Sequence, residues 1–409
     1  MSNLRIALRL TAVAVLLLTA QAARADRADR ALLLQAFQKA GQSERSAEPK
    51  VELLDEIIEK IAARHIDARS THPLAEKAAA VIAAKPTSLE DGFAAATAEL
   101  THVLDPHTAY LPPGEWKDMQ VSVSGKFSGV GMELSMKDKK VMVVSPIDGS
   151  PAEAAGIKTD DQVMAVDGTS VEGQTLTQVV TRIRGPVGQD VRLLMRRPDG
   201  KEREVTITRD IIRLHPVKGR LEGDVAVVRV SQFSGGVSAM LRLELMGLEK
   251  QAAFGLKGVV LDLRRNPGGL LDEAVRMADL FLGAVPIVST KAREAGDSED
   301  RTGRAGEILP GLPMVVLIDG GSASASEIVA GALKDNKRAT LVGQKSYGKG
   351  SVQVLQDVSE GGIRVTIARY FRPSQQPVDG IGITPDIDVA PAETGDPQLD
   401  RALAVVRGK

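Results

Sequence analysis

The 409-residue sequence predicts a multidomain α/β protein, in which a helical N-terminal region and a small β module precede an α/β core. Three observations predict this architecture. The chain is roughly two to three times as long as a usual domain. Its apolar spacing is helical up to about residue 104 and strand-like from there to about residue 208. Beyond residue 211, apolar strands alternate with helical stretches, which is typical of an α/β layer structure.

The composition excludes some classes of function. Hydrophobic residues make up 43% of the chain and charged residues 26%, as in an ordinary soluble globular protein. The 52 basic and 53 acidic residues leave a net charge of -1, and aromatic residues are 3%, so we expect neither the basic patch nor the stacking platform of a nucleic-acid-binding protein. The chain has no cysteine, so it has neither a disulfide nor a residue for a lipid anchor.

Residues 1–25 contain the three parts of a secretory signal peptide. A basic start at 1–9 is followed by an apolar run at 10–20 and by the small-residue site A-R-A at 23–25. An uncleaved membrane anchor is the alternative, but the apolar run is short for a bilayer. We therefore expect cleavage and export, and in a Gram-negative source a soluble periplasmic protein without a lipid anchor.

The region expected to be helical, 26–112, carries two apolar stripes that are separated by a polar break at 41–49. The stripes consist of Leu32, Leu33, Ala36 and Phe37, and of Val51, Leu54, Ile57, Ile58 and Ile61. The helical pattern stops at a proline-rich junction, L-D-P-H-T-A-Y-L-P-P at 104–113.

The module expected at 113–210 contains short strand-like runs and one helix at 175–184. The runs lie at 121–127, 131–136, 141–145, 162–166, 191–196 and 205–208. G-V-G at 129–131, S-P-A-E-A-A-G at 150–156 and an Asp-Gly turn at 167–168 follow in that order, which resembles PDZ domains. Ordinary β-turns are the alternative interpretation of the glycines.

The resemblance to PDZ domains implies that this module captures a peptide tail by strand addition. Two glycines around an apolar residue allow consecutive backbone N–H groups to point at one carboxylate. The predicted binding residues are Gly129, Val130, Gly131 and Met132, and the helix at 175–184 would form the other wall of the groove.

The α/β core is expected at 211–392, followed by a C-terminal tail at 393–409. Strands are predicted at 225–230, 258–263, 314–318 and 340–342, helices at 237–248, 271–282 and 326–334, and a polar surface loop at 293–307.

A serine-rich turn, D-G-G-S-A-S-A-S-E at 319–327, follows the third predicted strand and opens a helix. A helix start presents unpaired N–H groups and a positive dipole end, which suit a developing oxyanion. A serine at this place can attack a carbonyl, but local chemistry does not choose among Ser322, Ser324 and Ser326. Ser324 with Glu327 also matches the S-x-x-E capping box, which would be purely structural.

A lysine is favoured over a histidine as the general base for the serine. All five histidines, at 65, 72, 102, 107 and 215, precede the segment that carries the serines, so a Ser-His-Asp triad would need a distant histidine. Lys349 lies between two glycines in S-Y-G-K-G-S-V-Q at 346–353. As a base it must be neutral, so its pKa must fall from about 10.4 to about 7–8, which requires burial. A solvated loop lysine is the alternative.

Four motifs together resemble the carboxyl-terminal processing proteases, also called tail-specific proteases. They are L-D-P-H-T at 104–108, D-L-R-R-N-P-G-G at 262–269, G-S-A-S-A-S-E at 321–327 and Y-G-K-G at 347–350, in the order of that family. The resemblance implies a crotonase/Clp-like α/β protease core with an inserted PDZ β-barrel domain. It implies a Ser-Lys dyad, with Ser324 as the nucleophile, Lys349 as the general base and Gln353 orienting the lysine.

The same resemblance implies an oxyanion hole made by the backbone N–H of Ala325 with that of Gly268 or Gly269. Because Lys349 and Gln353 would lie about 13 Å apart in a straight strand, the glycines must curl the chain for them to touch. Asp319, where asparagine is commoner, and Arg265, where a smaller polar residue is frequent, are departures outside the dyad. No metal or organic cofactor is implied.

The expected partners are protein substrates with flexible C-terminal tails. By resemblance, Arg184 beside Gly185 is a candidate for coupling the PDZ module to the protease. The helices at 26–104 and the tail at 393–409 are candidates for homo-oligomer formation or for binding an activator or adaptor protein, with ordinary packing as the alternative. Two rival functions are a catalytically inactive PDZ adaptor and a non-peptidase acyl hydrolase.

Overall fold

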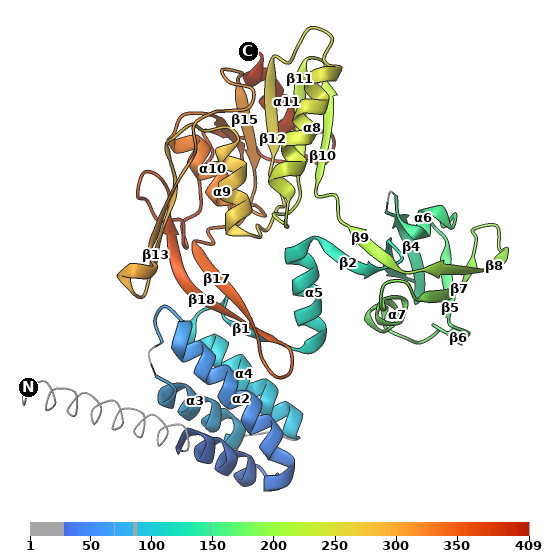
Figure 1. The fold of residues 1–409 in the computed structure, drawn as a ribbon, viewed down its shortest axis with the longest axis vertical. Coiled ribbons are helices and arrows are strands. Elements are labelled where there is room, and N and C mark those ends of the chain that lie inside the picture. Colours follow the sequence, from blue (N-terminus) through green and yellow to red (C-terminus); the bar gives the residue numbers. More distant parts are fainter. Residues whose placement is uncertain (1–27, 69, 85–87, 148, 409) are drawn as a thin grey trace, which may run out of the picture. The chain divides into compact units, whose positions relative to one another are not determined.

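The computed structural model describes residues 28–408 except 69, 85–87 and 148, and these residues form two compact units (Figure 1). Unit 1 combines 28–120 with 216–408, and unit 2 is the inserted segment 121–215. The predicted signal peptide at 1–25 lies outside the described residues. Among the helices of the described part, none is both long and apolar enough to cross a membrane.

Unit 1 is built around a six-stranded sheet that is parallel except for its first strand. In spatial order its strands are β10 (Val217–Glu222), β11 (Val225–Val230), β12 (Gly258–Asp262), β15 (Met314–Ile318), β16 (Thr340–Gly343) and β19 (Ile387–Asp388). Helices α8 (Val237–Gln251), α9 (Leu271–Asp279) and α10 (Ala325–Asp335) contribute to the core on one face, and α11 (Pro397–Val406) to the core on the other.

Burial on both faces explains why the four central strands, β11, β12, β15 and β16, are nearly continuous apolar runs in the sequence. Val228 and Leu261 belong to the core under α8, α9 and α10, whereas Val227 and Val260 belong to the core under α11. Successive side chains of a strand point to opposite faces, so each strand needs apolar residues at every position.

A second, antiparallel sheet in unit 1 connects the N-terminal helices to the core. Its strands are β1 (Ala109–Leu111), β13 (Pro286–Ala292), β14 (Glu299–Thr302), β17 (Ser351–Asp357) and β18 (Gly362–Phe371). The helices α2 (Glu44–Arg64), α3 (His72–Ala84) and α4 (Leu89–Leu104) share one apolar core with residues 358, 363 and 365 of this sheet region (Figure 1). β1 pairs with β18, so the chain segment after α4 is fixed beside a strand about 250 residues later.

Unit 2 is a β-rich module with its own apolar core. Its strands are β2 (Lys126–Gly129), β3 (Met132–Lys137), β4 (Lys140–Pro146), β5 (Gln162–Val166), β6 (Thr169–Ser170), β7 (Asp190–Arg196), β8 (Glu202–Thr208) and β9 (Asp210–Arg213), with the helices α6 (Pro151–Ala154) and α7 (Leu176–Ile183). β2 and β9, the first and last strands, pair with each other.

The strand predicted at 121–127 is wrong. This stretch continues helix α5 (Pro113–Ser124), and the strand begins only at Lys126. The alternation in M-Q-V-S-V-S has the period of a strand, but the helix is fixed upstream. Pro113 occupies its first position, as proline favours, and the indole of Trp116 is buried and donates to the Asp357 carboxylate at 2.9 Å. The predicted surface loop at 293–307 contains strand β14.

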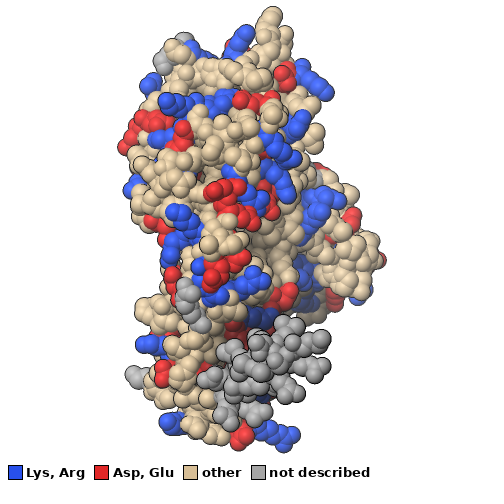
Figure 2. Space-filling model, turned by 60° about the vertical axis from the view of Figure 1, so that its left-hand side comes forward, with Lys and Arg blue, Asp and Glu red and all other residues tan. Residues whose placement is uncertain are grey.

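Basic and acidic side chains are interspersed over the face drawn in Figure 2. This mixture agrees with the nearly balanced composition of the chain.

Candidate active site

The turn between β15 and α10 distinguishes the three candidate serines. Ser322 and Ser326 are fully buried, and their hydroxyls donate to the carbonyl oxygens of Leu263 and Asn266, each at 2.9 Å. Ser324 is partly exposed and has φ 54° and ψ -114°, outside the regions that non-glycine residues favour. Backbone strain of this kind persists where the surrounding structure enforces it, and it is concentrated at functional sites.

Glu327 connects the serine turn to the lysine segment. Its Oε2 accepts the backbone N–H of Ser324 at 2.8 Å and that of Lys349 at 2.9 Å. Two donors on one oxygen place these two nitrogens within roughly 6 Å of each other. Its Oε1 accepts from the Ser346 hydroxyl and the Gly348 N–H. The contact to Ser324 is the one expected of a capping box, whereas the contact to Lys349 was not predicted.

Tyr370, on β18, makes a second connection between the same two residues. Its buried hydroxyl lies 3.1 Å from the carbonyl oxygen of Ser324 and 2.5 Å from that of Lys349. Burial raises the pKa of Tyr370 well above its ordinary value, so the hydroxyl keeps its proton. A phenol has a single proton, so the two carbonyl oxygens share it. The backbones of Ser324 and Lys349 are therefore held on both their N–H and C=O sides.

The environment of Lys349 shifts its protonation equilibrium toward the neutral amine. Burial lowers the pKa of Lys349, and the nearby Arg364 guanidinium lowers it further. Asp105 and Glu327 act in the opposite direction, but the net shift of the pKa is downward. Burial of a cation disfavours its charged form, which is the condition that a lysine base requires.

The glycine-rich loop after β12 lies against Ser324. A Cβ on Gly268 would be 2.8 Å from Cβ of Ser324 and 3.0 Å from the N atom of Ala325, so only glycine fits. The N–H of Gly268 donates to the Asn266 side chain at 2.9 Å. Within the described residues, the N–H groups of Gly269 and Ala325 have no acceptor. Of the two glycines considered from the sequence, Gly269 is thus the one with an available donor.

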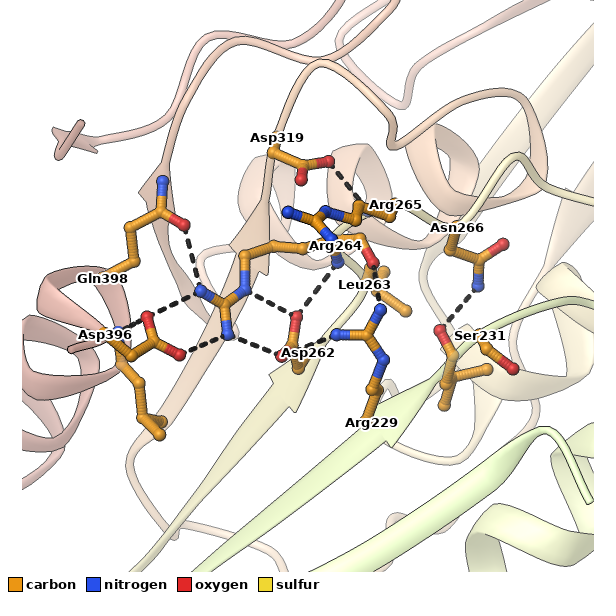
Figure 3. Close-up of polar contacts among 12 residues, drawn as sticks. Arg229, Ser231, Asp262, Leu263, Arg264, Arg265, Asn266, Asp319, Asp396 and Gln398 are labelled. Carbon is orange, nitrogen blue, oxygen red and sulfur yellow. Dashed lines mark hydrogen bonds and ion pairs between the residues drawn. The ribbon is translucent and has the colours of Figure 1, made fainter. Parts of the chain in front are cut away.

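A network of charged side chains supports this loop (Figure 3). Arg264 donates to both carboxylate oxygens of Asp262, at 2.8 and 2.9 Å, and of Asp396, at 2.7 and 2.8 Å. Although burial alone would lower the pKa of the Arg264 guanidinium, these carboxylates raise it above its ordinary value. Asp396 is the N-cap residue of α11, so the network ties the C-terminal helix to the loop.

The two departures from the family pattern contact each other. One oxygen of Asp319 accepts the backbone N–H groups of Arg265 at 2.8 Å and Gly321 at 2.9 Å. Arg265 has φ 55°, and this hydrogen bond holds its left-handed backbone (Figure 3). Asp319 thereby joins the glycine-rich loop to the serine turn.

Gln353 contacts neighbours other than the lysine. Its amide nitrogen donates to the hydroxyl of Ser351 at 2.8 Å and to that of Thr366 at 3.3 Å. A register shift in the pairing of β17 with β18 occurs immediately before Gln353. The Thr366 hydroxyl in turn donates to Asp105 at 3.1 Å, so the junction motif at 104–108 reaches the strand that carries Gln353.

Functional candidates that the sequence interpretation missed are Asp105, Tyr370, Arg364 and the second role of Glu327. Only Asp105 had a signal in the sequence, because it lies in the junction motif. A pocket of about 390 Å³ beside the lysine segment is lined by Asp105, His107, Gly348 and Ser351, among other residues. No cluster of three or more candidate metal ligands occurs in the part of the chain that the structure describes.

Unit 2 contains a groove of about 180 Å³ between β3 and α7. All the predicted binding residues line it, namely Gly129, Val130, Gly131 and Met132, together with Phe127, Leu134, Val180, Ile183 and Arg184. The guanidinium of Arg184 lies 5.5 Å from the ring centre of Phe127, in a cation–π arrangement. The walls are mainly apolar, with glycine backbone at one side.

Comparison with known proteins covers both units. The model of peptidase family S41 matches residues 224–389, and a PDZ domain model matches residues 142–197. A carboxy-terminal-processing protease of Bartonella bacilliformis is 44% identical over 289 residues, which are 70% of this chain and 67% of the relative. A carboxyl-terminal-processing protease of Synechocystis sp. is 39% identical over 306 residues, 73% of this chain and 70% of the relative.

One solved structure adds to these matches. A photosystem II D1 C-terminal processing protease superposes with a TM-score of 0.50 at 28% identity, over 83% of this chain and 92% of that one. The S41 match includes the serine turn, the lysine segment and β17.

Proposed function

The chain belongs to the carboxyl-terminal-processing proteases of peptidase family S41, which are serine peptidases, and we propose that Ser324 and Lys349 are its catalytic dyad. The observation that carries the proposal is the shared hydrogen bonding of the two residues through Glu327 and Tyr370. The helices on both faces of the parallel sheet also suit a crotonase/Clp-like core for the protease.

In this proposal neutral Lys349 removes the hydroxyl proton of Ser324, and the serine oxygen attacks the scissile carbonyl. The resulting ammonium then gives the proton to the leaving amine, and an acyl-enzyme forms. Lys349 next activates the water that hydrolyses the ester. Gln353 would present its amide oxygen to the lysine, because its nitrogen is engaged by Ser351 and Thr366.

The N–H groups of Ala325 and Gly269 would bind the oxyanion. Both lack another acceptor in the described structure, and Ala325 is the first residue of α10, where the helix dipole favours negative charge. Because the N–H of Gly268 is occupied by Asn266, Gly268 would serve to let the loop approach Ser324 closely.

The PDZ domain would capture substrate tails in the groove of unit 2, with their carboxylate at 129–132 and an apolar terminal side chain against Leu134, Val180 and Ile183. Arg184 would couple this groove to the protease. The signal peptide would export the enzyme to the periplasm, where proteins with flexible C-terminal tails would be its substrates. These assignments rest on the groove lining and the N-terminal sequence.

The dyad is tested by assaying the mature chain on denatured casein with Ser324→Ala and Lys349→Ala. Each variant should lose activity by about 10⁴-fold or more, because dyad members act as a unit. Wild-type activity should rise with pH through the lowered pKa of Lys349, since only the neutral amine is a base.

Ser326→Ala is the matched control, because Ser326 is in the same turn but buried. It should lose no more than about tenfold, since it removes one neutral hydrogen bond to Asn266. If wild type and Ser324→Ala leave casein equally intact, only the adaptor function remains, whereas cleavage by Ser324→Ala at the wild-type rate would refute the dyad. Hydrolysis of small amides without cleavage of casein would indicate an acyl hydrolase instead.

A further inference from the structure

We propose that Asp105 and Arg364 are an opposed pair of charges that positions Gln353 and sets the protonation of Lys349. Both would be positioning residues, since neither is required to touch substrate. The inference rests on the proposed role of Lys349 as the base. It assigns a positioning role in catalysis to the junction motif at 104–108. This motif lies more than 200 residues before the dyad in the sequence.

Asp105 is held as an anion by five hydrogen bonds. The donors are Nε2 of His65 at 2.7 Å, the N–H of His107 at 2.7 Å, the N–H and hydroxyl of Thr108 at 3.0 and 2.7 Å, and the hydroxyl of Thr366 at 3.1 Å. Nδ1 of His65 accepts two backbone N–H groups, so the proton of a neutral ring is on Nε2 and points to Asp105. Although burial alone would raise the pKa of the Asp105 carboxyl, these donors hold it well below its usual range.

Thr366 transmits the position of Asp105 to Gln353. The single hydroxyl proton of Thr366 is donated to the carboxylate, so its oxygen is left to accept from the amide nitrogen of Gln353. A second donation to Ser351 fixes the same nitrogen. Because both hydrogen bonds engage the amide nitrogen, they fix the orientation of the Gln353 amide. Its oxygen is then the atom that can accept a hydrogen bond from a lysine amine. Without the anion, the hydroxyl proton could face Gln353 and the amide could turn over.

Arg364 is fixed by a hydrogen bond to the same junction. Its Nε donates to the carbonyl oxygen of His107 at 2.7 Å, while the N–H of the same residue donates to Asp105. Within the described residues, Arg364 and Asp105 form no direct ion pair. Two charges that do not pair directly neutralise each other less, so each acts on its surroundings. Asp105 and His107 line the same pocket as Gly348 and Ser351, on either side of Lys349 in the chain.

Charged groups face Lys349 from several elements. Arg364 on β18 opposes the ammonium, whereas Asp105 on the junction and Glu327 on α10 favour it. His107 also lies in range, and burial together with Lys349 lowers the pKa of its ring, so it is neutral at neutral pH. The loop that contains Asp379 contributes a further carboxylate, which accepts the N–H of Gly350. Removal of Arg364 should therefore raise the pKa of Lys349, and removal of the Asp105 charge should lower it.

The test is the pH dependence of kcat/KM on denatured casein for Arg364→Gln, Arg364→Lys, Asp105→Asn and Thr366→Val. The acidic limb of the kcat/KM profile reports the pKa of the catalytic base in the free enzyme. It should move to higher pH by about one unit in Arg364→Gln and to lower pH by about one unit in Asp105→Asn, as expected for single nearby charges. Arg364→Lys keeps the charge and should leave the limb unchanged. Thr366→Val should lower kcat about tenfold with no shift, because it frees Gln353 but keeps both charges.

Opposite shifts would support the inference, because damage to folding cannot move the limb in two directions. If Arg364→Gln and Asp105→Asn shift the limb in the same direction, or lose activity with no shift, the two residues are merely structural. If Asp105→Asn does not fold, as judged by circular dichroism, the Arg364→Gln and Arg364→Lys pair decides. Lys349→Ala, measured in parallel, separates the two proposals. Activity of Lys349→Ala would refute the dyad itself. If Lys349→Ala is inactive and the limbs of Arg364→Gln and Asp105→Asn are unshifted, only this inference is refuted.

Discussion

The serine turn of unit 1 and the groove of unit 2 both use glycine for close approach, but different forces support them. Behind the turn are buried ionic groups, chiefly Glu327 and the pair of Arg264 with Asp262. The groove is walled mainly by apolar side chains such as Val180 and Ile183. Hydrogen-bonded charges fix atoms to a narrow geometry, whereas apolar walls tolerate exchange. We therefore expect the serine turn to tolerate substitutions less well than the groove of unit 2.

Gly268→Ala should give the largest effect of the substitutions that compare these regions. The added Cβ would lie 2.8 Å from the carbonyl oxygen of Ala323 and from Cβ of Ser324. The turn must shift, and displacement of a catalytic group by about 1 Å can reduce the rate about 10²-fold. We expect a loss of kcat/KM on casein of at least that size.

Gly306→Ala is its matched control. Gly306 has φ +107°, close to the +101° of Gly268, but nothing lies within 4 Å of an added Cβ. An added side chain would therefore strain the backbone at both glycines, but only at Gly268 would it collide with neighbouring atoms. Similar activity losses in the two variants would mean that backbone strain, and not proximity to Ser324, explains the result.

Gly131→Ala is the corresponding substitution in the groove, and a smaller effect is expected. Its Cβ would lie 2.3 Å from Cβ of Ser150, so the backbone beside the groove must move. Affinity for a fluorescent peptide with an apolar C-terminal residue should fall about tenfold by anisotropy, while kcat on a short peptide stays unchanged. Gly149→Ala, also at positive φ but in open space, should bind normally. A loss of kcat in Gly131→Ala would contradict the division of roles between the units.

Asp396→Asn, in the charged network of unit 1, should give the smallest effect. Asparagine can still cap α11 but loses the charge that Arg264 contacts, which should lower stability by about 1 kcal/mol. The measurement is the change in Tm, with the exposed Asp388→Asn as control. An unchanged Tm would mean that the network behind the loop adds no stability.

Much of the fold could be predicted because its strands and helices follow local patterns. Four parallel strands of unit 1, β11, β12, β15 and β16, are nearly continuous apolar runs, and their limits were found within one or two residues, whereas the short strand β19 was not predicted. The failure at 121–127 has a physical cause. A stretch with strand periodicity became helical because tertiary packing at Trp116 and a proline start favoured the helix upstream.

The candidate site was predictable only where its chemistry is local in sequence. The turn with Ser324 and the glycines around Lys349 are visible as motifs. The hydrogen bonds of Tyr370 and the path from Asp105 to Gln353 join residues separated by 13 to 261 positions, and no sequence spacing encodes them. The contact of Glu327 with Lys349 was hidden by its simpler role as a helix cap.

The insertion of unit 2 between two parts of unit 1 has a consequence for biosynthesis. All of unit 2, including its first and last strands, which pair with each other, is synthesised well before β18 at 362–371. β1 must wait for β18, so the N-terminal helices cannot complete their shared core until translation is almost finished. The sequence of the proposed peptide-binding groove is therefore complete before Ser324 and Lys349, the residues of the proposed dyad, have been added to the chain.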